Sequence, residues 1–186
     1  MADHEIKNTF FESLMILIFE AFGTAMLAML FVSDGGRNGF FAGFFILLIL
    51  SARISGSHYN PIVTLAWMLR KDPSVQFNKW LGILYMLAQT AGAIGGVFAA
   101  EYFFGLSAIN SSTRLSLNAI KENYPFMQCM VSETLGGFVL VLAYLTQTDE
   151  KYKLSNDAAI TLMIITASYM VAMALSHPIT HGDRWS

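Results

Sequence analysis

The sequence predicts an all-α polytopic membrane protein that forms a single membrane domain, residues 1–186. Hydrophobic residues make up 55% of the chain and charged residues only 13%, whereas a soluble domain of this size carries about 25% charged residues. Polar connectors separate apolar runs that are long enough to cross a bilayer. The second run leads directly into the loop that follows it, so its helix can extend that far. The five predicted spans are 13–32, 39–54, 80–104, 126–145 and 158–175.

The stretch Ser55–Thr64 predicts a short helix that enters the membrane without crossing it. Pro61 suits the first position of a helix, where its missing N–H costs nothing, and Asn60 suits the cap before it. The expected helix, 60–69, reaches about 15 Å, roughly half of a ~30 Å hydrocarbon core. Its positive end then points toward mid-membrane, where irregular backbone is tolerated only inside protein or beside water. Asn60 is therefore a plain helix cap or a pore-lining amide that donates to a passing solute, and its context favours the second role.

Two apolar helices carry a carboxyl group with a glycine three residues later, which indicates an internal repeat. Glu20-Ala-Phe-Gly23 in the first span resembles Glu133-Thr-Leu-Gly136 in the fourth. Three spans precede the second copy, so the copies have opposite orientations, as in channels and transporters built from inverted repeats. Each carboxyl must face the protein interior. It serves either in a proton relay or, as we favour, as an acceptor for the backbone N–H groups of a re-entrant loop.

The third span carries small residues at every fourth position, Ala88, Gly92 and Gly96, which predicts close helix packing. Gly23 and Gly56 are assigned to the same packing role. Gln89 lies beside this row and is expected to make an interhelical hydrogen bond.

Charge and motif content exclude several functional classes. The net charge of −2 gives no case for nucleic-acid binding, and no phosphate loop, nucleophile elbow or zinc spacing is visible, so we expect no enzyme, cofactor or metal. Seven Lys and Arg residues lie on the side of the N-terminus and four on the other side. This bias predicts an integral membrane protein whose N-terminus is on the cytoplasmic or matrix-like side.

At these motifs the chain resembles the aquaporin, or major intrinsic protein, family. That resemblance implies six tilted helices and two half-helices, usually in a homotetramer with one pore per protomer for water or small neutral solutes. It makes Asn60 the first of two amides that orient water, with His58 also lining the pore and Phe40 at the outer constriction. The matching motifs are Glu20-x-x-Gly-Thr24, Ser55-Gly-x-His58-x-Asn60-Pro-x-Val-Thr64, Ala88-Gln89-x-x-Gly92-Ala93 and the second Glu133 helix.

The chain departs from the family pattern in its second half. Ile62 replaces the usual alanine, and alignment places Met173 at the constriction position of the fifth helix and Trp185 where the second asparagine belongs. We therefore expect an aquaporin-like inverted repeat with five spans and one re-entrant half-helix, lacking the second half-helix and sixth span. Its first repeat, 13–104, is complete and its second, 126–186, is incomplete.

Two functional hypotheses follow. The first is a degenerate passive channel for water or small neutral solutes, which conducts only if another chain supplies the missing half or if the sequence is itself part of a longer one. The alternative is a non-conducting structural subunit of a larger membrane assembly. Membrane lipid and other membrane chains, in a homotetramer or a larger hetero-assembly, are the expected partners. A proton-coupled transporter that uses Glu20 and Glu133 is a distant third.

Overall fold

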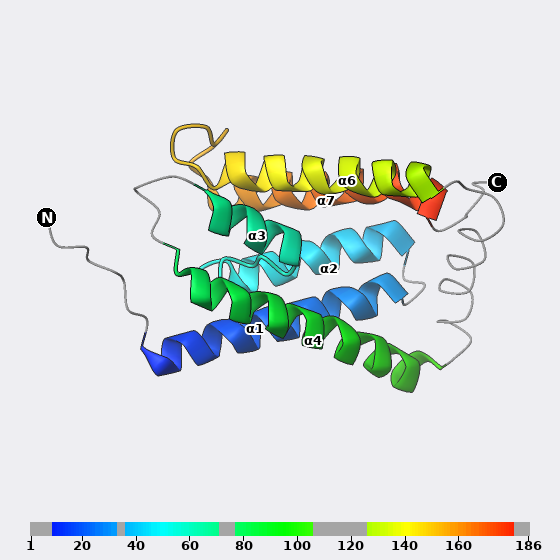
Figure 1. Cartoon of the computed structure of the whole chain (residues 1–186), viewed down its shortest axis with the longest axis horizontal. Helices are drawn as coiled ribbons and strands as arrows, with labels where there is room; N and C mark the ends of the chain where they lie inside the picture. The colour runs from blue at the N-terminus through cyan, green and yellow to red at the C-terminus, as the bar shows by residue number, and fades with distance from the viewer. Residues whose placement is uncertain (1–8, 33–35, 71–76, 106–125, 181–186) are drawn as a thin grey trace, which may run out of the picture.

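The computed structural model describes residues 9–32, 36–70, 77–105 and 126–180, and every regular element among these residues is a helix, with no strand (Figure 1). This confirms the predicted fold class. The helices, with the labels of Figure 1, are α1 (Phe10–Val32), α2 (Gly36–Ser51), α3 (Pro61–Leu69), α4 (Lys79–Phe104), α6 (Phe126–Gln147) and α7 (Ala158–Thr180).

Four of the described helices are long and apolar enough to cross a membrane: α1, α4, and the segments 130–147 of α6 and 158–175 of α7. The second predicted span differs from the expectation. Its apolar helix ends at Ser51, and residues 52–55 form a turn in place of a continued helix. The 16 residues of α2 reach about 24 Å, which is less than a full crossing. The chain then enters the re-entrant segment.

The helices form two outer pairs with a shorter middle layer. α1 packs along α4, and α6 packs along α7. α2 and α3 lie between the two pairs, with α2 against α1 and α7, and α3 against α4 and α6 (Figure 1). α1 and α6, which carry the two repeated glutamate motifs, run in opposite directions in this view, as an inverted repeat requires.

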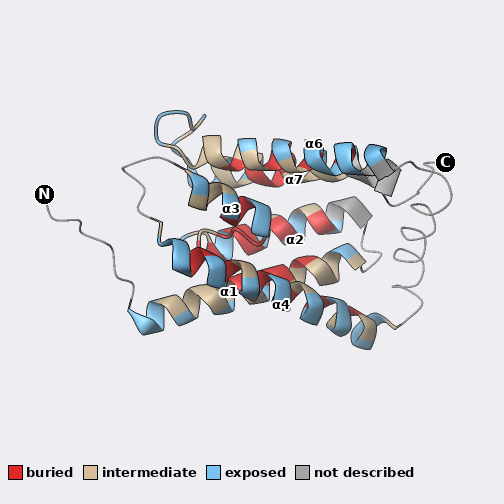
Figure 2. Ribbon diagram, viewed as in Figure 1, coloured by how far each residue is buried: buried red, intermediate tan, exposed pale blue. Residues whose placement is uncertain are grey.

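Burial follows the pattern of a protein surrounded by lipid. Large hydrophobic side chains such as Phe11, Leu87 and Phe98 lie exposed on the outer helix faces (Figure 2). Polar side chains are buried between the helices, among them Glu20 and Gln89, both at 0% exposure. Because a polar group in hydrocarbon has no water to pair with, these groups must pair with one another.

α1 and α4 approach each other closely, and glycines make this possible. A Cβ atom on Gly92 would lie 2.2 Å from the backbone oxygen of Ala21, and one on Gly96 would lie 2.2 Å from that of Ala25. Ala88, one turn earlier in the same row, is half-buried. This spacing brings Glu20 on α1 within reach of Gln89 on α4.

Candidate functional site

The candidate site is the segment between α2 and α3, which turns back inside the membrane protein. Its backbone is irregular: Gly56, Ser57 and Tyr59 have φ angles of +81°, +53° and +47°. Serine and tyrosine rarely adopt this left-handed region, and each such residue costs about 1–3 kcal/mol unless its surroundings hold it there. The loop therefore depends on contacts from neighbouring helices.

Glu20 on α1 provides the main contact. One carboxylate oxygen accepts hydrogen bonds from the Ser55 hydroxyl, at 2.5 Å, and from the His58 backbone N–H, at 3.1 Å. The other accepts from the Tyr59 backbone N–H, at 2.8 Å, and from Nε2 of Gln89, at 2.7 Å. A single buried carboxylate thus accepts hydrogen bonds from two backbone N–H groups that lie outside any helix, and these bonds are charge-assisted.

Gln89 and Thr64 extend this network to the start of α3. Nε2 of Gln89 also donates to the Thr64 hydroxyl, at 3.0 Å, and that hydroxyl lies 3.1 Å from Nδ1 of His58. Gln89 and Thr64 are completely buried. The network joins α1, the re-entrant loop, α3 and α4 through side chains alone, so it fixes where the half-helix begins.

Tyr59 and Ser51 hold the loop on its other side, a pair that sequence reasoning missed. The Tyr59 hydroxyl donates to the Leu47 carbonyl, at 3.0 Å, and contacts the Ser51 hydroxyl. Its ring lies against Gly23, where a Cβ atom would come within 2.0 Å of it. The sequence did contain a signal for this pair. Tyr59 precedes an asparagine that was predicted to lie inside the membrane, and a phenol buried there needs a hydrogen-bond partner.

Asn60 caps α3, and Pro61 takes the first helical position. The side-chain oxygen of Asn60 accepts from the Ile62 backbone N–H at 3.0 Å. No described residue accepts a hydrogen bond from its amide nitrogen, and the side chain is half-buried. The nine residues of α3 reach about 14 Å, so this amide group lies at the inner end of a half-length helix.

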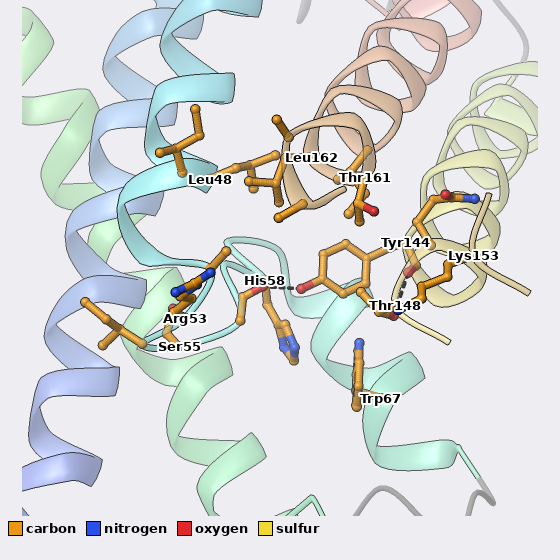
Figure 3. Close-up of a pocket in the computed structure, with 18 of the residues that line it drawn as sticks. Leu48, Arg53, Ser55, His58, Trp67, Tyr144, Thr148, Lys153, Thr161 and Leu162 are labelled. Atoms are coloured by element: carbon orange, nitrogen blue, oxygen red, sulfur yellow. Dashed lines mark hydrogen bonds between the residues drawn. The ribbon is translucent and has the colours of Figure 1, made fainter. Parts of the chain in front are cut away.

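A cavity of about 840 Å³ adjoins the loop, between the end of α2, the end of α6 and the start of α7. Its inner wall is aromatic. The His58 ring is 5.8 Å from that of Trp67, 5.2 Å from that of Tyr85 and 5.5 Å from that of Tyr144 (Figure 3). Residues from the ends of α2, α6 and α7 line the remainder, among them the apolar Leu48 and Leu162 and the charged Arg53 and Lys153.

The other predicted site residues lie elsewhere. Phe40 is 4% exposed and packs on Tyr169, with ring centroids 5.6 Å apart, and Met173 packs against the same hydrophobic cluster. Neither lines the cavity beside the loop, and their pore-lining role stays a prediction. Glu133 is exposed and has no hydrogen bond or ion pair with a described residue. Trp185 lies outside the described residues.

The fold and this site define a class: a polytopic helical membrane protein built around a re-entrant half-helix. The sequence model of the Major intrinsic protein family matches residues 6–182. The chain therefore belongs to the Major intrinsic protein family.

Curated relatives carry aquaporin names. Aquaporin-5 of Ovis aries is 33% identical over 98 residues, which is 53% of this chain and 34% of that protein. The probable aquaporin PIP2-5 of Arabidopsis thaliana is 36% identical over 108 residues, or 58% and 35%. Aquaporin PIP2-1 of the same plant is 32% identical over 140 residues, or 73% and 46%. The chain thus spans between about one third and one half of the length of these relatives.

Proposed function

We propose that this chain is a passive transmembrane channel for water or small neutral solutes, in which Asn60 and His58 line the path. The observation that carries the proposal is the loop that Glu20 organises. It places the N-terminus of a half-helix, capped by Asn60, in the middle of the protein. The amide nitrogen of Asn60 donates no hydrogen bond to a described residue. A polar donor at the positive end of a half-helix favours a neutral solute and opposes cations.

The cavity supports the same proposal. It leads to the aromatic wall around His58, and Nε1 of Trp67, one of its lining residues, is buried without a hydrogen-bond partner among the described residues. A buried N–H of this kind requires an acceptor, and a water or small polar solute in the cavity can supply one. A second polypeptide segment, from this or another chain, completes the opposite half of the path.

The experiment is osmotic shrinkage of proteoliposomes that hold the full chain, compared with an Asn60→Asp variant. Asp caps a helix about as well as Asn, so the change removes the amide donor and adds a charge while the cap remains. Asn78→Asp is the matched control, because Asn78 caps α4 in the same way at its exposed end. We expect Asn60→Asp to lower permeability and Asn78→Asp to leave it unchanged. Equal permeability in all three proteins, well above that of empty vesicles, would contradict the assignment of Asn60.

One observation favours a second candidate, the non-conducting structural subunit. Glu133 is exposed on a membrane helix without a partner among the described residues, and an unpaired carboxyl in the membrane costs about 2–3 kcal/mol or more. A neighbouring membrane protein that donates hydrogen bonds to it would remove this cost. Proteoliposomes that shrink no faster than empty vesicles, with the protein folded and inserted, would favour this candidate.

A further inference from the structure

Tyr144 reaches from α6 across to the re-entrant loop. Its hydroxyl donates a hydrogen bond to the carbonyl oxygen of Gly56, 88 positions earlier in the chain, and its side chain is 4% exposed. Figure 3 shows the ring extending from α6 to the loop beside His58, with Thr161 and Leu162 of α7 on its other side. The ring therefore lies where the cavity meets the loop.

The contacts of the ring leave little space around the loop at this point. Tyr144 meets the His58 ring edge-on, at an interplanar angle of 89°. The preceding loop carbonyl, that of Ser55, accepts from the Tyr85 hydroxyl at 2.6 Å. Two successive backbone carbonyls are thus bonded to tyrosine hydroxyls. In channels, backbone carbonyls that line a path replace the hydration shell of the passing solute. Each of these two carbonyls already accepts one hydrogen bond from a tyrosine.

A second contact keeps the same end of α6 close to the half-helix. The guanidinium of Arg70, which follows α3, forms an ion pair with Asp149 at 2.6 Å. Asp149 lies five residues after Tyr144, just beyond the end of α6. The side chains are only 12% and 21% exposed, so solvent screens this pair less than an exposed one. It links the end of α3 to the end of α6 from which Tyr144 projects.

We propose that the Tyr144 side chain closes the solute path between the cavity and Asn60, and that it sets the permeability of the channel. The proposal rests on the channel function proposed above. When the ring moves away from the loop, the Gly56 carbonyl becomes free to accept a hydrogen bond from a passing water. With the ring in place, that oxygen has its partner and the passage beside His58 is filled.

The test compares osmotic permeability among full-length variants in phosphatidylcholine–phosphatidylglycerol vesicles. Tyr144→Phe keeps the ring and removes the hydrogen bond, and a net bond of this kind shifts an equilibrium by about 2- to 10-fold. Tyr144→Val removes the ring as well, so its permeability should rise further. The matched control is Tyr152→Val, because Tyr152 is 62% exposed in the α6–α7 loop and does not line the cavity. Circular dichroism and gel filtration check that each variant folds.

The outcomes separate failure of this proposal from failure of the channel function. Increased permeability in both Tyr144 variants, with Tyr152→Val equal to the unmodified chain, supports the proposal. Equal permeability in all four proteins, well above that of empty vesicles, overturns the role of Tyr144 and leaves the channel function standing. Permeability equal to that of empty vesicles in all four, with the proteins inserted, overturns both. Because Tyr144→Phe changes a single atom, it tests the proposal even where Tyr144→Val fails to fold.

Discussion

Replacing Glu20 with glutamine keeps the shape of the side chain and removes one acceptor oxygen. In the structure, the two oxygens serve different backbone donors: one accepts from the N–H of His58 and the other from the N–H of Tyr59. Glutamine has one oxygen, so it can serve only one of these N–H groups, and its own NH₂ then faces the other. The Ser55 hydroxyl can rotate and the Gln89 amide can flip, but a backbone N–H cannot change its role.

The expected loss of stability follows from this count. A buried donor left without its partner costs about 1–3 kcal/mol, and the bonds that remain change from charged to neutral, which weakens them by about 1 kcal/mol. We therefore expect Glu20→Gln to lower the free energy of unfolding by about 2–4 kcal/mol. Glu133→Gln is the matched control, because this glutamate of the second repeat has no partner among the described residues. It breaks no hydrogen bond with a described residue and removes an unpaired charge from the membrane, so it should not lower the free energy of unfolding.

Titration with SDS in mixed micelles, followed by circular dichroism, measures both variants under the same conditions. Hydrogen exchange at the amide groups of His58 and Tyr59 should also accelerate in Glu20→Gln. A Glu20→Gln variant as stable as Glu133→Gln would contradict this role of Glu20, since the loop would then keep its conformation without the second oxygen.

Two further predictions concern packing and charge. Gly96→Val should lower the free energy of unfolding by about 2 kcal/mol or more, as measured by SDS titration. Its Cβ would lie 2.2 Å from the Ala25 backbone oxygen, so the backbones of α1 and α4 would have to separate. Gly95→Ala, with nothing within 4 Å of its Cβ, should instead be neutral or stabilising by up to about 1 kcal/mol. A double-mutant cycle on Arg70 and Asp149 should give a coupling energy above about 1 kcal/mol, since both side chains are largely buried.

The control for the ion pair is a second pair in the same region. Lys153 and Glu150 also lie 2.6 Å apart, but the glutamate is 88% exposed, so the same cycle should give less than about 0.5 kcal/mol. Coupling energies that do not differ between the two pairs would show that burial does not strengthen the Arg70 pair. A Gly96→Val protein as stable as Gly95→Ala would likewise contradict the close approach of α1 and α4.

The local signals in the sequence were enough to predict the half-helix. The Asn60-Pro61 pair predicted its start and Arg70 its end, and the structure begins α3 at Pro61 and ends it at Leu69. These signals are local, since a cap and a proline act within one helical turn. The long apolar runs predicted α1, α4, α6 and α7 for the same reason, because span length depends on composition alone.

The end of α2 and the tyrosines of the site could not be predicted in this way. α2 ends at Ser51, whose hydroxyl bonds to Ser57 at 2.6 Å and to Tyr59, so the position depends on how the loop folds back. Tyr144 lies in an apolar run, and its distance to Gly56 depends on the packing of α6 against the first repeat. Such contacts are tertiary, and no periodicity in the sequence encodes them.

If Asn60 and Tyr144 act as proposed, solute passes the Asn60 amide once Tyr144 has left the path. The most direct measurement is the osmotic permeability of vesicles that hold Tyr144→Val, with and without Asn60→Asp in the same chain. We expect rapid shrinkage for the single variant and a return toward the rate of empty vesicles for the double variant. Equally rapid shrinkage in both would contradict it, because the solute would then cross without meeting Asn60.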